Sequence, residues 1–154
     1  MLKVITFDPG DHTGWVSRDE NGVLSGGTIF TGKHIWEDIT SLNALIQAKK
    51  PDVIVYETFN LYPGAAAHLV HNEFYPCQMI GVIKTLAHMY HIHYVVPQAP
   101  SVKRYSGGLD DRWKTLRNVL GVETSEHTKD SYLHLKYYEM FNEKRIEKFR
   151  ISYL

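Results

Sequence analysis

The chain opens with Met1-Leu-Lys-Val-Ile-Thr-Phe-Asp-Pro-Gly-Asp-His-Thr-Gly-Trp-Val16, and this segment sets the architecture that we predict. An apolar run over residues 2–7 ends in Asp8-Pro9-Gly10, and Gly14-Trp15-Val16 begins a second run. Short apolar runs bounded by Pro and Gly are typical of strands joined by a turn. Asp8 therefore lies at the end of a buried strand, where a carboxylate needs a partner. An Asp that caps the turn through its own backbone would explain the position equally well.

The bulk composition is that of an ordinary globular domain. Of 154 residues, 44% are hydrophobic and 22% charged, and the formal net charge is zero. We expect one domain over residues 1–154, without a signal peptide or a membrane-spanning segment. A single cysteine, Cys77, excludes an internal disulfide framework and suits a reducing compartment. The net charge does not indicate a nucleic-acid partner, which would need a local basic face.

Hydrophobic periodicity predicts an α/β fold. The predicted strands cover residues 2–7, 15–17, 23–30, 52–56 and 92–96. The predicted helices cover residues 34–49, 74–91, 101–105, 109–120 and 126–142, with a charged continuation over 143–150. Strand–helix–strand connections imply parallel strands with right-handed crossovers. We therefore predict a mixed five-stranded sheet, three antiparallel strands plus parallel strands, with helices on both faces.

Two further acidic side chains, Glu57 and Asp130, are predicted to lie close to Asp8. Glu57 ends the strand over 52–56, so Asp8 and Glu57 both lie at carboxyl ends of neighbouring central strands, where ligands of such sheets gather. His127 and Asp130 are three positions apart at the start of the last helix and share a face. A salt bridge for Glu57, or a helix-start interaction for Asp130, is individually the more common role. Asp8, Glu57 and Asp130 all lie at positions that fit one site. A common site explains this better than coincidence does.

Converging carboxylates need a cation to neutralise them. Oxygen-rich sites select Mg²⁺, with Mn²⁺ as a substitute, over soft metals. Two such ions, about 3.5–4 Å apart, are a recurring device for phosphodiester cleavage, in which one activates water and the other stabilises the leaving oxygen. We predict such a site at Asp8, Glu57 and Asp130, where His127 positions the water or acts in proton transfer.

Four segments of the chain carry a resemblance to a known family: Asp8-Pro9-Gly10-x-x-x-Gly14, Pro51-Asp52-x-x-x-x-Glu57, Gln98-x-x-x-x-Lys103 and His127-x-x-Asp130. In this order, and over nearly the whole chain, they resemble RuvC-type Holliday junction resolvases of the RNase H-like superfamily, particularly the small phage-encoded branch. The resemblance implies an RNase H-like fold, a Mg²⁺-dependent endodeoxyribonuclease that resolves branched DNA, and the four side chains above as its metal-binding and catalytic set. It also implies a location in the cytoplasm of a bacterium or a phage-infected host. A resolvase nicks two strands symmetrically, so we expect a two-fold homodimer that matches the symmetry of the junction. The helix over 74–91 is a candidate interface, and the alternative is that its apolar residues simply cover the sheet.

Basic and aromatic side chains near the last helix form the candidate DNA surface. Lys and Arg neutralise phosphates, and aromatic rings stack on unpaired bases. The predicted contacts are Lys103, Arg104, Tyr105, Arg112, Trp113, Lys114 and Arg117. Members of the family carry an aromatic residue just beyond the strand glutamate, and Phe59 and Tyr62 lie near that position. Basic residues over 144–150 alternate with acidic ones, so we interpret them as a solvated face.

Three alternative functions stay open at this point. A flap, nicking or less selective nuclease would use the same fold and the same carboxylates. An actin-like or sugar-kinase-like ATP-binding domain also begins with a strand, an Asp and a Gly-containing turn. That domain predicts a second Gly-rich phosphate loop after a later strand, and Glu57-Thr-Phe-Asn-Leu-Tyr62 does not resemble one. A non-catalytic DNA-binding relative would have a broken carboxylate set, whereas here the set is complete.

Overall fold

The computed structural model describes residues 1–10, 12–30, 35–60, 74–121 and 124–152. The strands are β1 (Val4–Asp8), β2 (His12–Arg18), β3 (Leu24–Phe30), β4 (Val53–Glu57) and β5 (Tyr94–Gln98). The helices are α1 (Ile35–Lys49), α3 (Tyr75–Met89), the 3-10 helix η1 (Pro100–Tyr105), α4 (Asp111–Leu120), α5 (Glu126–Phe141) and α6 (Glu143–Ser152). None of the helices in these ranges is long and apolar enough to cross a bilayer.

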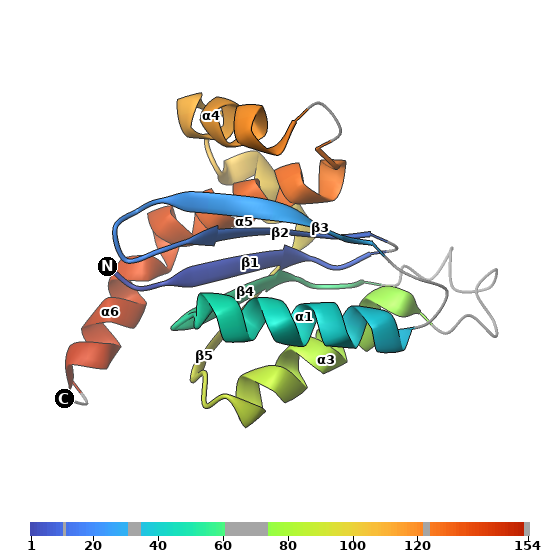
Figure 1. Cartoon of the computed structure of the whole chain (residues 1–154). Coiled ribbons are helices and arrows are strands. Elements are labelled where there is room, and N and C mark those ends of the chain that lie inside the picture. Colours follow the sequence, from blue (N-terminus) through green and yellow to red (C-terminus); the bar gives the residue numbers. More distant parts are fainter. Residues whose placement is uncertain (11, 31–34, 61–73, 122–123, 153–154) are drawn as a thin grey trace.

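The strands form one sheet in the order β3-β2-β1-β4-β5. The pairs β1–β2 and β2–β3 are antiparallel, whereas β1–β4 and β4–β5 are parallel. Helices α1 and α3 cover one face and α5 covers the other (Figure 1). The predicted mixed five-stranded sheet with helices on both faces is confirmed.

The last strand is displaced from its predicted range. We expected it to end at residue 96, before Pro97, but β5 runs through Pro97 to Gln98. The reason is that β5 lies at an edge of the sheet, where a residue without a backbone N–H can be accommodated. As a consequence, Gln98 lies directly beside Glu57.

Alternation along β1 and β4 determines which side chains face α5. Val4 lies in the core under α5, and Ile5 lies in the core under α1 and α3. Because side chains alternate between the faces of a strand, Asp8 is on the same face as Val4, and Glu57 on the same face as Val53. Val4 pairs with Val53 in the parallel register of β1 and β4. Asp8 and Glu57 therefore end neighbouring strands at the same level, beneath α5.

Two glycines in the first turn allow α5 to approach the sheet. A Cβ at Gly14 would lie 2.1 Å from the carbonyl carbon of His127, so no side chain fits there. Ser131 Oγ donates a hydrogen bond to the Gly14 carbonyl at 2.8 Å, and Thr6 Oγ1 donates one to the Ser131 carbonyl at 2.7 Å. A Cβ at Gly10 would lie 2.9 Å from the imidazole of His127. Because neither glycine carries a side chain, the start of α5 can lie directly over the ends of the strands.

A buried arginine ties α6 to the other end of the sheet. The guanidinium of Arg18 is 1% exposed, and it donates hydrogen bonds to Glu139 at 3.0 Å, to Glu143 at 3.1 Å and to the Leu2 carbonyl at 2.9 Å. Arg112 of α4 donates a hydrogen bond to Glu139 at 3.2 Å. We call the four charged side chains Arg18, Arg112, Glu139 and Glu143 the Arg18 cluster.

Candidate active site

Three acidic side chains from separate elements meet above the sheet. Asp8 ends β1, Glu57 ends β4 and Asp130 lies in the second turn of α5. One oxygen of each carboxylate lies within 4.8 Å of an oxygen of both others. Asp8 is buried, and the other two are half-buried. This carboxylate cluster (Asp8, Glu57 and Asp130) has the all-oxygen donors and the spacing of a site for a hard metal ion.

One lysine neutralises part of the carboxylate cluster. Lys103 of η1 places its Nζ 3.1 Å from Glu57 Oε2 and 2.9 Å from Asp130 Oδ2. We predicted Lys103 as a DNA contact, and its position inside the cluster is a finding that the sequence did not suggest. This ammonium pairs with two of the three carboxylates, and no other Lys or Arg of the described residues forms an ion pair with the cluster, so lysine and arginine leave it with an excess of negative charge.

Burial and charge shift the pKa values of the cluster in opposite directions. Burial, followed by repulsion from Glu57, raises the pKa of Asp8 to about 6, against the hydrogen bond from His127. Burial would also raise the pKa of Glu57, but hydrogen bonds from His134 and Lys103 outweigh burial and lower it. The charge of Asp8 is therefore less well compensated than that of Glu57.

His127 lies at the rim of the carboxylate cluster. Its Nδ1 is 2.8 Å from Asp8 Oδ2, and its side chain is 38% exposed. An ionised carboxylate can only accept a hydrogen bond, so Nδ1–H donates to Asp8 and Nε2 is left as an acceptor. The predicted shared face of His127 and Asp130 on α5 is consistent with this placement.

Two further polar residues belong to the site, although the sequence analysis did not assign them to it. His134 is fully buried, with Nε2 2.7 Å from Glu57 Oε2 and Nδ1 2.6 Å from Gln98 Oε1. Helical spacing was the available signal, because His134 follows Asp130 by four positions and so lies on the same face of α5. The sequence analysis included Gln98 only as part of a motif. Its contact with His134 depends on the extension of β5 to residue 98.

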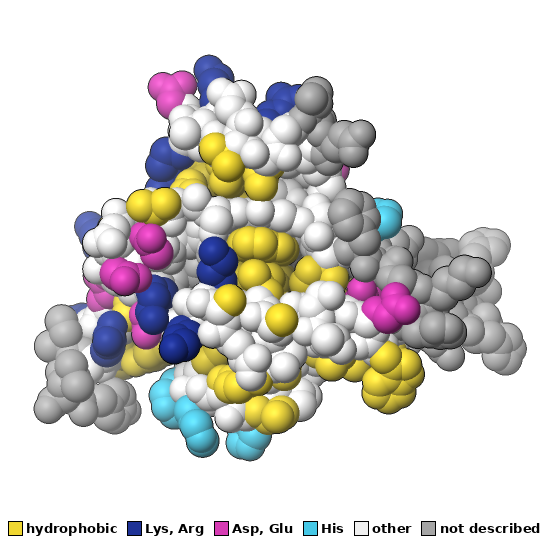
Figure 2. All heavy atoms as spheres, in the orientation of Figure 1, with side chains coloured by type: hydrophobic (Ala, Val, Ile, Leu, Met, Phe, Trp, Pro, Cys, Tyr) yellow, Lys and Arg dark blue, Asp and Glu magenta, His cyan; other side chains and the backbone are white. Residues whose placement is uncertain are grey.

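The predicted DNA contacts on η1 and α4 are largely exposed. Arg104 and Tyr105 lie at the end of η1, with the guanidinium 5.8 Å from the centre of the Tyr105 ring. Lys114 and Arg117 are exposed on α4 and line a hollow of about 330 Å³. Figure 2 shows basic side chains over α4, at the top of the molecule. These four side chains are accessible to a large anionic ligand.

Two predicted contacts on α4 have other roles. Trp113 is 5% exposed, and its ring packs 5.5 Å from that of Tyr132 in the core between α4 and α5. Its predicted stacking on DNA bases is therefore wrong, because the ring is not accessible. The guanidinium of Arg112 is bound by Glu139.

Of the two aromatic residues predicted as DNA contacts after Glu57, the structure describes one. Phe59 is exposed, and its ring lies 5.8 Å from that of Phe74. Tyr62 lies outside the described residues. Insertion of either ring into a junction stays a prediction.

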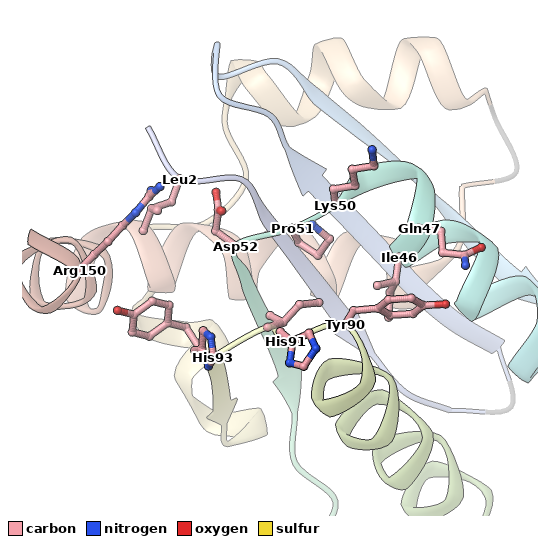
Figure 3. Close-up of a pocket in the computed structure, with 12 residues that line it drawn as sticks. Leu2, Ile46, Gln47, Lys50, Pro51, Asp52, Tyr90, His91, His93 and Arg150 are labelled. Carbon is pink, nitrogen blue, oxygen red and sulfur yellow. The ribbon is translucent and has the colours of Figure 1, made fainter. Parts of the chain in front are cut away.

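A cavity of about 970 Å³ lies away from the carboxylate cluster. Its lining includes Leu2, Pro51 and His93, which precede β1, β4 and β5, and Arg150 of α6 (Figure 3). It therefore lies at the amino ends of the parallel strands, whereas the carboxylates lie at their carboxyl ends. The chemistry of the cluster does not involve this cavity.

The fold has clear relatives among solved structures. Thermus thermophilus RuvC in complex with a Holliday junction substrate matches with a TM-score of 0.63 and 15% identity, over 92% of this chain and 97% of that one. The fowlpox virus resolvase in complex with its substrate Holliday junction DNA matches with a TM-score of 0.52 and 14% identity, over 92% and 99% of the two chains. The yeast mitochondrial Holliday junction resolvase Ydc2 matches with a TM-score of 0.50 and 11% identity, over 98% and 84%.

Comparison of the whole sequence with family models and curated proteins finds no relative. No protein-family model matches the chain, and no curated protein matches it significantly. At 11–15% identity the structural likeness establishes the fold. The chain has the RNase H-like fold of RuvC-type resolvases, as the resemblance of its motifs implied; membership of the phage-encoded branch stays a prediction.

Proposed function

We propose that the protein is a Mg²⁺-dependent, structure-selective endodeoxyribonuclease that cuts branched DNA, with the four-way junction as its substrate. The observation that carries this proposal is the carboxylate cluster, whose oxygens lie within 4.8 Å of one another on a RuvC-type fold. Solved structures of that fold include resolvases in complex with Holliday junctions, which supports the choice of substrate.

The residues of the cluster fit a divalent cation. All three donors are carboxylates, which suit Mg²⁺ and Mn²⁺ better than softer metals. The raised pKa of Asp8 supports the same assignment, because burial and the neighbouring Glu57 disfavour its charge until a cation compensates it. Two ions held by Asp8, Glu57 and Asp130 would supply an activated water and stabilise the leaving oxygen of the phosphodiester.

The protein's own side chains prepare the site for proton transfer. Asp8 accepts the Nδ1–H of His127 and so fixes the imidazole with its Nε2 as an acceptor. We assign to this Nε2 the positioning of a water molecule and the acceptance of its proton. Lys103 forms ion pairs with Glu57 and Asp130, since its ammonium lies within 3.1 Å of both carboxylates.

Accessible basic and aromatic side chains are proposed to bind the DNA. The set is Lys103, Arg104, Tyr105, Lys114, Arg117 and Phe59, with Lys103 contacting the phosphate at the cleavage site. Phosphate neutralisation would supply most of the affinity, and binding would weaken as the salt concentration rises. The compartment proposed for this activity is the cytoplasm, where the free, exposed thiol of Cys77 would stay reduced.

We propose that the protein acts as a homodimer through the exposed face of α3. Cys77, Gly81 and Thr85 follow one another at helical spacing on this face. A glycine inside a helix costs about 1 kcal/mol relative to Ala. A Cβ at Gly81 would meet no described atom within 4 Å, so packing among the described residues does not require the glycine. Close approach of a second copy would explain it, and a two-fold dimer matches the symmetry of a four-way junction.

Sedimentation velocity tests the dimer directly. We expect the wild type to sediment as a dimer and Gly81→Arg as a monomer. Ala44→Arg, at an exposed position of α1, is the matched control and should stay dimeric. A Gly81→Arg protein that sediments with the wild type would exclude α3 as the interface.

Cleavage of defined DNA substrates tests the proposed activity. A labelled four-way junction is compared with matched duplex, flap and single strand, each in Mg²⁺, Mn²⁺ or EDTA. The variants are Asp8→Asn and Glu57→Gln. The control is Asp111→Asn, because this carboxylate on α4 is 99% exposed and lies outside the cluster.

We expect paired symmetric nicks on the junction that EDTA and both cluster variants abolish and that Asp111→Asn retains. Metal-dependent cutting of all four substrates would support a less selective nuclease and exclude junction selectivity. The absence of cutting with either metal would refute the catalytic proposal and return the carboxylates to a structural role.

A further inference from the structure

We propose that His134 is a positioning residue of this active site: held by Gln98, it fixes the orientation of the Glu57 carboxylate for metal binding. The proposal rests on the proposed function and adds to it a residue that the motifs do not contain.

Both ring nitrogens of His134 are occupied. Nε2 lies 2.7 Å from Glu57 Oε2, and because an ionised carboxylate only accepts, Nε2–H is the donor. Nδ1 lies 2.6 Å from Gln98 Oε1. An amide oxygen only accepts, so this contact is a hydrogen bond either when Nδ1 also carries a proton or when the amide is rotated by 180° and its NH2 donates to Nδ1. The other end of the amide lies 3.3 Å from Asn142 Oδ1. A polar chain thus runs from the C-terminal end of α5, through the end of β5, to the carboxylate cluster.

Glu57 needs such a support because its carboxylate rotates easily. The terminal torsion of a glutamate is broad, unlike the staggered torsions nearer the backbone. His134 and Lys103 both bind Oε2, and no hydrogen bond to Oε1 is found among the described residues. The two oxygens therefore have different roles: the protein holds Oε2 and leaves Oε1 as an acceptor.

The two donors to Oε2 differ in how firmly they are held. Lys103 is partly exposed, lies on a flexible four-carbon stem and divides its ammonium between Glu57 and Asp130. His134 is 0% exposed, and its second nitrogen is fixed by Gln98, which is itself 4% exposed. His134 is thus the rigid donor, and it lies on the same helix as Asp130.

Packing alone does not explain a histidine at this position. The neighbouring Leu135 fills the core under α5 with an apolar side chain, which needs no hydrogen bonds. A buried imidazole without partners carries a desolvation cost, whereas a fully bonded one restricts its neighbours to one arrangement. Groups that orient metal ligands in this way typically contribute 10–100-fold to metal affinity or activity.

The test is Mn²⁺ binding by His134 variants, measured by electron paramagnetic resonance, together with the Mn²⁺ concentration for half-maximal junction cleavage. His134→Leu removes both hydrogen bonds at similar volume, and we expect Mn²⁺ affinity to fall by roughly 10–100-fold. His134→Gln keeps a donor that can reach Glu57, and it should recover most of the loss. Gln98→Leu removes only the support of His134 and should give a smaller loss than His134→Leu.

Leu135→Ala is the matched control, since it damages the same core without touching Glu57. It should lower the unfolding temperature and leave the Mn²⁺ affinity of the folded protein unchanged. If His134→Leu folds less stably but binds Mn²⁺ as tightly as the wild type, His134 is a core residue and the proposal is wrong. If His134→Leu does not fold, unchanged Mn²⁺ affinity in Gln98→Leu overturns the proposal, and a weakened one supports it.

The binding measurement separates this proposal from the proposed function. Wild-type protein that binds Mn²⁺ but leaves junction DNA intact would refute junction cleavage, while the variants would still decide the role of His134. Wild-type protein that binds no Mn²⁺ would overturn both.

Discussion

The molecule carries two ionic networks on α5, and they differ in how their charges balance. The Arg18 cluster lies near the C-terminal end of α5 and pairs two guanidinium groups with two carboxylates. The carboxylate cluster lies near the N-terminal end of α5 and sets three carboxylates against the single ammonium of Lys103. Asp8 and Glu57 are the last residues of β1 and β4, whereas Arg18 pairs with Val4, the first residue of β1, so the two networks lie at opposite ends of β1.

The difference separates a structural network from a functional one. Breaking a buried, balanced pair leaves an uncompensated charge, so each member of the Arg18 cluster contributes to holding the fold together. An unbalanced cluster destabilises the fold by itself, and proteins retain such features at functional sites. Each prediction below tests one side of this contrast, in order of decreasing expected effect.

Neutralising Asp130 in the carboxylate cluster should have the largest effect, and this effect should be on activity. Asp130→Asn should lower the rate of junction cleavage on the order of a thousandfold, because a metal site contributes several kcal/mol to the transition state. Its unfolding temperature should stay close to that of the wild type. Single-turnover cleavage and thermal unfolding measure the two quantities. An active Asp130→Asn protein would show that the carboxylate cluster is not the functional network.

Breaking the Arg18 cluster should act on stability alone. Arg18→Met leaves Glu139 and Glu143 without their buried partner, so the free energy of unfolding should fall by about 3–5 kcal/mol. Urea denaturation measures this loss. Under conditions where the variant is folded, its cleavage rate should match that of the wild type. A loss below about 1 kcal/mol would show that the cluster is not structural.

The pH dependence of stability should expose the cost of ionised Asp8. Its pKa of about 6 in the folded protein exceeds the unfolded value of 3.8, so the folded state binds the proton more tightly. In EDTA, ionised Asp8 therefore destabilises the wild type as the pH rises through 6. Asp8→Asn should be more stable than the wild type by about 2–3 kcal/mol at pH 7.5.

That advantage should disappear as the pH falls from 6 towards 4, where the wild type protonates Asp8. Urea denaturation of both proteins across this range measures the difference, and the comparison cancels the other titrating groups. A difference that does not change with pH would contradict the shifted pKa.

The smallest effect is expected at the exposed member of the Arg18 cluster. The side chain of Arg112 is 42% exposed, so solvent screens its pair with Glu139. Arg112→Met should cost less than about 1 kcal/mol of unfolding free energy. A loss as large as that of Arg18→Met would show that burial does not distinguish the two arginines.

Local patterns in the chain predict most of the fold and the core of the site. The apolar runs of β1 and β4 end at Asp8 and Glu57, so the sequence places both carboxylates at strand ends. The spacing of His127 and Asp130 depends only on the pitch of a helix. Such regularities act over a few residues, so they can be detected without knowledge of the tertiary contacts.

The remaining features depend on contacts between distant parts of the chain. Arg18 and Glu143 are 125 positions apart, and Glu57 and His134 are 77 apart. Their meeting requires α5 to dock on the sheet at Gly14, and no local pattern encodes the geometry of that docking. For the same reason the sequence placed Trp113 on the surface, since the pattern of α4 does not reveal that Tyr132 covers the ring. Local geometry thus sets the helix or strand, and the face of it, on which a charged or aromatic side chain lies. Long-range packing decides which partner that side chain contacts.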